Sequence, residues 1–252
     1  MPRRDMHVHS SFSDDSREPM EAQCERALAL GLDALCFTEH MDFDALSLDY
    51  YDPDAYFAEL GRLREVYAGR LTLLAGLELS EPHNHPKALE QARRRPYDFI
   101  LGSVHYWLGG LFPSQMRDRK MDLRRCCEAY WAEMLKMARC GGFDCVAHLD
   151  FPKRFFLRLE YDPNLLDEIF EAMLQNGLLL EINTSSLRRG CGEPMPGEAL
   201  LRQYIARGGR HVTLGSDAHR AEELYEGVKG ARDLAEGLGL EVVGFKEREM
   251  VV

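Results

Sequence analysis

The sequence predicts a single-domain α/β protein with a mostly parallel sheet, the organisation of an α/β barrel. The length of 252 residues suits one such barrel. Short apolar runs alternate seven times with longer amphipathic segments, and this repeat is typical of parallel strands joined by helices. No linker or low-complexity tract divides the chain, so we expect residues 1–252 to form one domain.

Seven apolar runs are the predicted strands. They contain Leu, Ile, Val and Phe without strict polar alternation, as expected for strands buried on both faces. In order they are Asp5–His9, Asp33–Thr38, Leu71–Leu79, Asp98–His105, Asp144–His148, Leu178–Asn183 and His211–Ser216. Leu240–Phe245 is a possible eighth strand.

The segments between these runs are predicted helices. Glu18–Leu30 has apolar residues at helical spacing and stops at Gly31. Asp52 and Asp162 each precede a proline, the arrangement of a capping acid before the first helical turn. The other predicted helices are Met121–Cys140, Gly197–Arg207 and Ala221–Leu238, whereas Asp42–Tyr51 and Gly109–Lys120 are predicted to be long loops after strands, where barrels place function.

Composition limits the possible partners and compartment. A formal net charge of −11 argues against a broad nucleic-acid surface, since phosphate backbones are bound by Lys and Arg. The seven cysteines form no CxxC pair, which fits a reduced, cytoplasmic setting. No stretch approaches the ~20 apolar residues of a membrane span, and the N-terminus lacks a signal-peptide core. We expect a cytoplasmic protein without a membrane or nucleic-acid partner, and no feature indicates an oligomeric state.

Metal-capable side chains stand at the ends of most of the predicted strands. Six of the nine histidines lie at the end of a run or within three residues of it. In a parallel barrel these ends converge on one face, and imidazole with carboxylate suits Zn, Fe or Mn. The residues are His7, His9, Asp14, Asp15, His40, Glu78, His105, His148, Asp217 and His219. So many donors exceed the needs of one ion and predict a multinuclear metal site.

Each residue also has a structural explanation by itself. His105 and His148 could be core histidines, and Asp217 could cap the helix that follows. Their joint occurrence at one end of the barrel favours metal binding. His211 begins its run and belongs at the opposite end, and His83 and His85 in "SEPHNHPK" are predicted to lie in a loop that lines the pocket.

Seven stretches in order identify a family resemblance. They are "HVHSSFSDDS", "CFTEHMDFD", "GLELS", "DFILGSVHYW", "FDCVAHLDFPKR", "EINTSSLR" and "TLGSDAHR", and they span Asp5 to Arg220. The chain resembles the polymerase-and-histidinol-phosphatase (PHP) superfamily, and within it the monofunctional histidinol-phosphate phosphatases of histidine biosynthesis. The resemblance implies a distorted (β/α)7, TIM-like barrel.

The resemblance also implies three divalent ions, which could be Zn, Fe or Mn. The first ion would be held by His7, His9, Glu78 and Asp217, the second by Glu78, His105 and His148, and the third by Asp15, His40 and His219. Many relatives have a single Asp before Gly where this chain has Asp14 and Asp15. Asp15 is favoured as the ligand because other members place theirs six residues after the second histidine.

The implied reaction is hydrolysis of a small phosphate monoester by a hydroxide that bridges the metals. Arg154 and Arg188 are candidates to bind the phosphoryl oxygens, and Asp217 or His219 could give a proton to the leaving group. For histidinol phosphate, one of three acids, Asp42, Asp44 or Asp150, would face the amine, and Tyr106 or Trp107 would pack on the ring.

Two other functions are compatible with the sequence. A related phosphoesterase could act on another small phosphomonoester or a nucleotide. From a different class, a metal-dependent binding or regulatory module could have lost turnover, although such modules usually lack a ligand and none is missing here.

Overall fold

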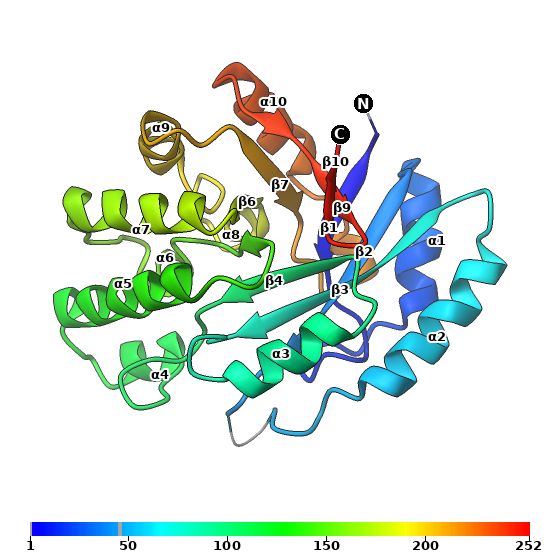
Figure 1. Ribbon diagram of the computed structural model, residues 1–252, viewed down its shortest axis with the longest axis horizontal. Coiled ribbons are helices and arrows are strands. Elements are labelled where there is room, and N and C mark those ends of the chain that lie inside the picture. Colours follow the sequence, from blue (N-terminus) through cyan, green and yellow to red (C-terminus); the bar gives the residue numbers. More distant parts are fainter. Residues whose placement is uncertain (1, 45–46) are drawn as a thin grey trace.

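A single parallel sheet of eight strands curves around the centre of the molecule, and the strands follow one another in chain order (Figure 1). The computed structural model describes residues 2–44 and 47–252. The strands are β1 (Arg4–Val8), β2 (Ala34–Met41), β3 (Thr72–Ser80), β4 (Phe99–Ser103), β5 (Cys145–Val146), β6 (Leu179–Asn183), β7 (His211–Gly215) and β8 (Glu241–Val242). All seven predicted runs form strands, and the possible eighth, Leu240–Phe245, contributes two residues to this sheet as β8 and two, Gly244 and Phe245, to the separate strand β9 (Gly244–Lys246).

The sheet closes on itself at its carboxyl end. Val8 at the end of β1 forms a parallel bridge with Ala218, which follows β7. The His9 amide donates to the Ala218 carbonyl (2.9 Å), and the Asp217 amide donates to the His7 carbonyl (2.8 Å). β8 pairs only with the first two residues of β7. This uneven closure agrees with the distorted barrel that the resemblance implies, and it brings Asp217 next to His7.

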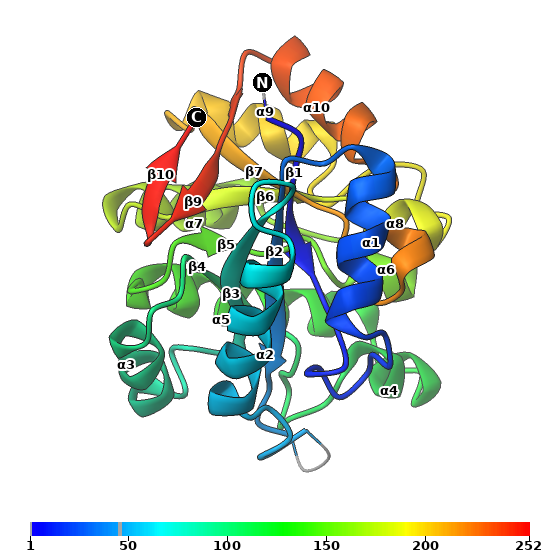
Figure 2. The same ribbon diagram turned by 90° about the vertical axis from the view of Figure 1, so that its right-hand side faces the viewer.

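Helices cover the outside of the sheet (Figures 1 and 2). They are α1 (Met20–Leu30), α2 (Pro53–Val66), α3 (Pro86–Arg94), α4 (Pro113–Asp118), α5 (Leu123–Cys140), α6 (Lys153–Phe156), α7 (Pro163–Gln175), α8 (Ser185–Arg188), α9 (Glu198–Ala206) and α10 (Val228–Gly237). The predicted caps are present, since Asp52 accepts hydrogen bonds from two amides of α2 and Asp162 accepts one from α7. None of the helices in the described ranges could cross a membrane.

Three predicted segments differ from the structure. The helix expected over Ala221–Leu238 is wrong as one element, because a 3₁₀ turn (η1, Ala221–Glu223) and the left-handed Gly227 (φ 76°) precede α10. A Cβ at Gly227 would lie 2.7 Å from Leu187, so packing as well as backbone conformation requires glycine. The loop Gly109–Lys120 contains α4, and the last two residues of "SEPHNHPK", Pro86 and Lys87, are the first two of α3. Residues 45 and 46 of the predicted loop Asp42–Tyr51 lie outside the described residues.

A C-terminal hairpin covers the amino end of the barrel. It consists of β9 (Gly244–Lys246) and β10 (Glu249–Val251). Phe245 stacks on Phe99 of β4 with ring centroids 4.9 Å apart, and Arg248 donates to the Asp144 carboxylate before β5 at 2.7 Å. The amino end of the barrel is therefore filled by apolar side chains, and buried polar residues concentrate at the carboxyl end.

Candidate metal centre

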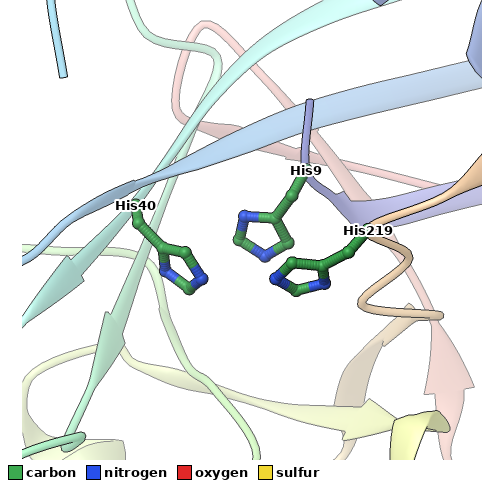
Figure 3. Close-up of side chains that lie close together, drawn as sticks. All are labelled: His9, His40 and His219. Carbon is green, nitrogen blue, oxygen red and sulfur yellow. The ribbon is translucent and has the colours of Figure 1, made fainter. Parts of the chain in front are cut away.

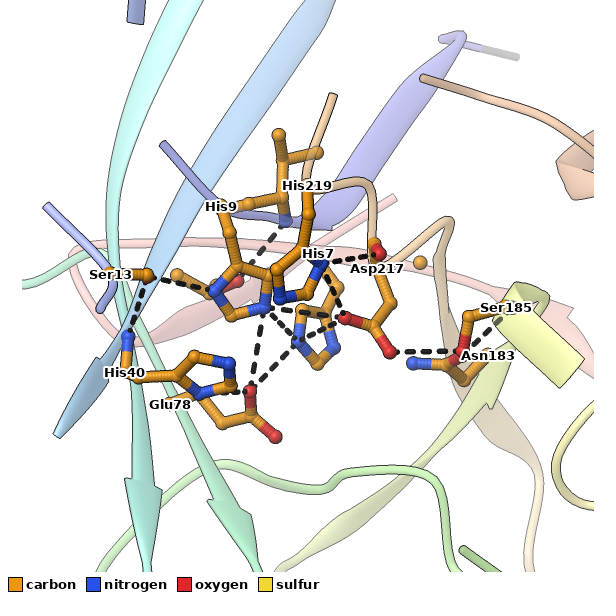
Figure 4. A network of polar contacts seen from close by, with 12 residues as sticks. His7, His9, Ser13, His40, Glu78, Asn183, Ser185, Asp217 and His219 are labelled. Atoms are coloured by element: carbon orange, nitrogen blue, oxygen red, sulfur yellow. Dashed lines mark hydrogen bonds and ion pairs between the residues drawn. The ribbon is translucent and has the colours of Figure 1, made fainter. Parts of the chain in front are cut away.

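The first predicted group of ligands assembles where β1, β3 and β7 end (Figure 4). His7 and His9 are two residues apart on an extended segment, so both rings turn to the same side. The Nε2 atom of His7 lies 3.0 Å from Nε2 of His9, 3.1 Å from Oε2 of Glu78 and 3.8 Å from Oδ1 of Asp217. His9 Nε2 lies 3.4 Å from the same Asp217 oxygen. Two imidazole nitrogens and two carboxylates thus converge on one point.

Glu78 connects this group to the second one. Its Oε1 atom lies 2.7 Å from Nε2 of His148 and 3.2 Å from Nε2 of His105, and these two nitrogens are 3.4 Å apart. Its Oε2 atom faces His7 and, at 3.1 Å, Nδ1 of His40. Glu78 is fully buried, and this is the position that a bridging carboxylate would occupy.

The third group contains His40, His219 and Asp15. The rings of His40 and His219 both lie next to His9, with centroids 4.1 and 4.2 Å from its centroid and 5.6 Å from each other (Figure 3). Asp15 reaches both outer rings, at 3.6 Å from Nε2 of His40 and 3.1 Å from Nε2 of His219. Asp14 instead accepts a hydrogen bond from the Ser47 hydroxyl at 2.6 Å. The structure therefore brings Asp15, and not Asp14, to the histidines.

Two of these residues have an unfavourable backbone conformation. His148 has φ 24° and Asp217 has φ 54°, values that residues with a side chain rarely adopt. Such conformations persist only where the surroundings hold them, and they concentrate at functional sites. The Asp217 side chain is held by Arg154 Nη1 (3.1 Å) and the Ser185 hydroxyl (2.9 Å), both donating to Oδ2.

The charged and polar side chains of the cluster interact strongly because most of them are buried away from water. Burial acts to raise the pKa of Glu78, but His7, His105, His40 and His148 outweigh it and hold that pKa well below its usual value. Burial, together with the nearby His40 and His219, holds the pKa of His9 well below the ordinary histidine value. Burial also acts to lower the pKa of the other rings, but neighbouring carboxylates outweigh it and raise the pKa of His7, His40, His105 and His219, so a divalent ion would displace protons there. A neutral imidazole offers a lone pair and an ionised carboxylate offers two oxygens, which are the forms that bind metals.

The donor set fits divalent cations. Within residues 2–44 and 47–252, four groups of three side chains place their ligand atoms within 4.8 Å of one another. They are His7–His9–Asp217, Glu78–His105–His148, His9–His40–His219 and His40–Asp42–His105. Mixed nitrogen and oxygen ligands at this spacing suit Zn, Fe or Mn. The fourth group adds Asp42, which the sequence analysis assigned to the substrate and not to a metal.

A cavity of about 1160 Å³ opens over the cluster. Among its lining residues are the two arginines that were predicted to bind phosphate. Arg154, on α6, and Arg188, on α8, are each about one-seventh exposed. Arg188 Nη2 donates to the carbonyls of Ser216 and Asp217 at 2.9 and 3.0 Å. In the described part of the chain, the buried Arg154 Nε and Arg188 Nη1 have no hydrogen-bond acceptor. Two guanidinium donors thus remain for an anion.

The predicted substrate residues divide into those inside and those outside the cavity. Asp42, Asp44 and Tyr106 line it, and the Tyr106 hydroxyl donates to Asp44 at 2.9 Å. Asp150 is wrong for this role because it forms a buried ion pair with Lys153 (2.6 Å) away from the cavity. Trp107 is also wrong, since its ring is buried and its Nε1 donates to the Cys126 carbonyl.

The remaining three histidines lie outside the cavity. His83 pairs with Glu133 of α5 at 2.8 Å, and the His85 ring stacks on Phe43. The prediction that these two line the pocket is therefore wrong. His211 pairs with Glu241 at the start of β7, at the opposite end of the barrel, as predicted.

Sequence reasoning missed a buried carboxylate behind the cluster. Glu181 of β6 is 1% exposed and lies 2.6 Å from Nδ1 of His7. The signal was an acid inside an otherwise apolar strand, two residues before Asn183, because such an acid must meet a buried partner.

Comparison with known proteins places the chain in a family. The PHP domain family model matches residues 5–185. The chain belongs to the PHP domain family. Among curated PHP relatives, the "Probable histidinol-phosphatase" of Deinococcus radiodurans is 32% identical, and the match covers 98% of this chain and 97% of the relative. The "Histidinol-phosphatase" of Lactococcus lactis is 28% identical over 95% of this chain and 92% of its own.

Solved structures confirm the fold. The crystal structure of histidinol phosphate phosphatase from Lactococcus lactis, complexed with zinc, L-histidinol and phosphate, superposes with a TM-score of 0.83 at 24% identity and covers 100% of this chain and 99% of that one. The putative histidinol phosphatase of Listeria monocytogenes superposes with a TM-score of 0.78 at 17% identity, over 90% of this chain and 99% of that one. Both share the PHP barrel with this protein.

Proposed function

We propose that this PHP protein is a metal-dependent phosphatase that hydrolyses L-histidinol phosphate to L-histidinol and phosphate, a reaction of histidine biosynthesis. The main supporting observation is the juxtaposition, in one cavity, of the histidine and carboxylate cluster with two arginines that have unused donors. The full-length relatives named histidinol-phosphatase indicate which phosphate monoester is the substrate.

Three divalent ions are proposed, in the three groups built around His7, His105 and His40. Support comes from the ligand atoms of these groups, which converge at three neighbouring points that share Glu78 and His9. When bound, such ions supply a water of lowered pKa and polarise the phosphoryl oxygens. Zn, Fe and Mn all suit this mixture of imidazole and carboxylate.

Arg154 and Arg188 are proposed to bind the phosphate of the substrate. A guanidinium presents several donors in a plane and matches the oxygens of a phosphate. Arg154 is held by Asp217 and Arg188 by two backbone carbonyls, so both heads are fixed before the substrate arrives. Fixed donors lose little entropy on binding, which strengthens the binding of a phosphate that matches their geometry.

Of the two candidates for giving a proton to the leaving oxygen, His219 can serve only while its Nε2 is not a ligand of the third ion, because its Nδ1 faces the Asp217 carbonyl at 3.0 Å. Both Asp217 oxygens are occupied: Arg154 and Ser185 donate to Oδ2, and Oδ1 faces Nε2 of His7 and His9, where the first ion would lie. The carboxylate is therefore committed as an acceptor. His219 lines the cavity and is about one-fifth exposed, so a leaving alkoxide can reach its ring.

The organic end of the substrate is proposed to lie against Asp42, Asp44 and Tyr106. L-Histidinol carries a cationic amine and an imidazole, so it needs negative charge and a flat ring nearby. Asp44 is fixed by the Tyr106 hydroxyl, and Asp42 lies 3.2 Å from Nδ1 of His105. The amine would therefore face an acidic wall, while the phosphate faces the arginines.

A substrate panel on metal-reconstituted protein tests the function. We expect kcat/KM for L-histidinol phosphate to exceed by far the values for p-nitrophenyl phosphate and nucleoside monophosphates. A reversed preference would reject the histidine pathway and leave a PHP phosphoesterase with another substrate. Fewer than two ions per chain, with no activity after Mn or Zn addition, would instead favour a non-catalytic binding module.

A further inference from the structure

A single buried carboxylate behind the metal cluster contacts two of its predicted ligands at once. Glu181 points its two oxygens in different directions. Oε1 lies 2.6 Å from Nδ1 of His7, and Oε2 accepts the backbone N–H of His148 at 2.8 Å. The Asn183 side chain donates to Oε2 at 3.2 Å. Glu181 is not among the residues that line the cavity, so it acts only through its neighbours.

Contact with Glu181 sets the tautomer of His7. An ionised carboxylate accepts hydrogen bonds and donates none, so the nitrogen that faces it must bear a proton. When an ion binds, His7 Nδ1 therefore keeps its proton, and Nε2, which faces Glu78, His9 and Asp217, is the nitrogen that gives up its proton and offers the lone pair. A histidine that ligates a metal usually donates its other N–H to such a partner, which fixes the ring and raises its basicity.

Contact with Glu181 also holds the backbone of His148. This residue has φ 24°, which costs conformational energy, and its amide is the group that Glu181 Oε2 accepts. The same residue places its Nε2 atom 2.7 Å from Glu78. The strained turn after β5 therefore directs an imidazole into the second group, and the hydrogen bond to Glu181 helps to keep it there.

Gly215 provides the space that this arrangement needs. A Cβ at this position of β7 would lie 2.4 Å from Oε1 of Glu181 and 2.4 Å from Cβ of His7. Only glycine allows a side-chain pair to approach the strand so closely. The close contact of Glu181 with His7 is thus built into a neighbouring strand.

We propose that Glu181 is a positioning residue that orients His7 and His148 together and so couples the first and second ion sites. The inference rests on the proposed function only in that both invoke bound divalent ions. A carboxylate is required because two N–H groups approach from different sides. Glutamine has one acceptor oxygen, so in Glu181→Gln its amide would place N–H against the N–H of His7 or of His148.

Zinc titration of metal-free protein tests the role without using activity. With a competing chromophoric chelator, we expect Glu181→Gln to bind zinc about 10–100-fold more weakly than the wild type. Asp144→Asn is the matched control, since Asp144 is also a buried carboxylate that accepts a backbone amide, from Ile100 at 2.8 Å, but at the opposite end of the barrel. It should bind zinc like the wild type. Equal zinc affinity in Glu181→Gln and wild type would overturn the proposal.

If Glu181→Gln does not fold, a measurement on the wild type tests the proposal instead. In the zinc-loaded protein, imidazole nitrogen NMR should show His7 with a protonated Nδ1 whose proton is shifted downfield and exchanges slowly. A deprotonated Nδ1 on His7 would refute the inference. Failure of the proposed function looks different: the wild type would then not hydrolyse L-histidinol phosphate, while Glu181→Gln would still weaken zinc binding.

Discussion

Replacing Arg154 by alanine should weaken phosphate recognition by an amount that follows from its contacts. Its Nη1 atom already donates to Asp217, whereas its buried Nε has no acceptor in the described residues. Filling that donor with a phosphoryl oxygen forms a hydrogen bond between charged groups, which contributes about 1.5–3 kcal/mol. Because 1.4 kcal/mol corresponds to a factor of ten, kcat/KM for L-histidinol phosphate should fall roughly 10–150-fold in Arg154→Ala.

Steady-state kinetics and product inhibition measure this effect together. The inhibition constant of inorganic phosphate should rise by a similar factor, since the same donor binds the product. Arg154→Lys should recover little, because an ammonium lacks the planar arrangement of donors. Arg202→Ala, at an exposed pair with Glu198, is the control and should behave like the wild type. An Arg154→Ala variant with full zinc content and unchanged phosphate inhibition would show that this arginine does not bind the phosphate.

Three further perturbations distinguish residues needed for activity from residues needed for the stability of the fold. Substitution of His105 or His148 by alanine should abolish activity with a small change in Tm; strong destabilisation with retained activity would make them core histidines. Removal of metal by a chelator should lower both activity and Tm, and added Zn or Mn should restore them, as expected when a ligand binds only the folded state. Arg248→Ala should reduce the free energy of unfolding by about 1–3 kcal/mol, because it leaves the buried Asp144 without its cation. Denaturant unfolding measures this loss of stability. The activity of the folded enzyme should not change.

The strand ends were predictable because parallel strands converge whatever their detailed packing. His40, Glu78 and His105 each come from a different strand, yet their positions in the runs placed them on one face. The choice between Asp14 and Asp15 was not predictable in the same way, since it depends on Ser47, which is far along the chain and donates a hydrogen bond to Asp14. The residues next to Asp14 and Asp15 in the sequence do not indicate a contact with so distant a residue.

The C-terminal hairpin was missed for a similar reason. Its two-residue turn is Glu247-Arg248, with φ 52° and 64°, whereas the usual signals for such a turn are Asn-Gly or Asp-Gly. Asp98 compensates for the unfavourable residues, because its carboxylate accepts the Glu247 amide (3.0 Å) and its carbonyl accepts the Arg248 amide (2.9 Å). The hydrogen bonds from Asp98 therefore stabilise a turn that the turn residues themselves do not favour.

Charge in the cavity connects metal binding to phosphate binding. The cavity is lined by five arginines and eight acidic side chains, so with its histidines in the neutral form that binds metals, its fixed charges alone would repel a phosphate dianion. Part of this excess is Glu78, Asp217 and Asp15, the same carboxylates that contact the histidines. Divalent cations held there would reverse the sign of the local field, since bound ions are the largest charges in such a site. The same carboxylates therefore have two effects. Without ions their negative charge opposes phosphate binding, and with ions bound they hold the cations that attract phosphate. Removal of the ions should therefore abolish phosphate affinity.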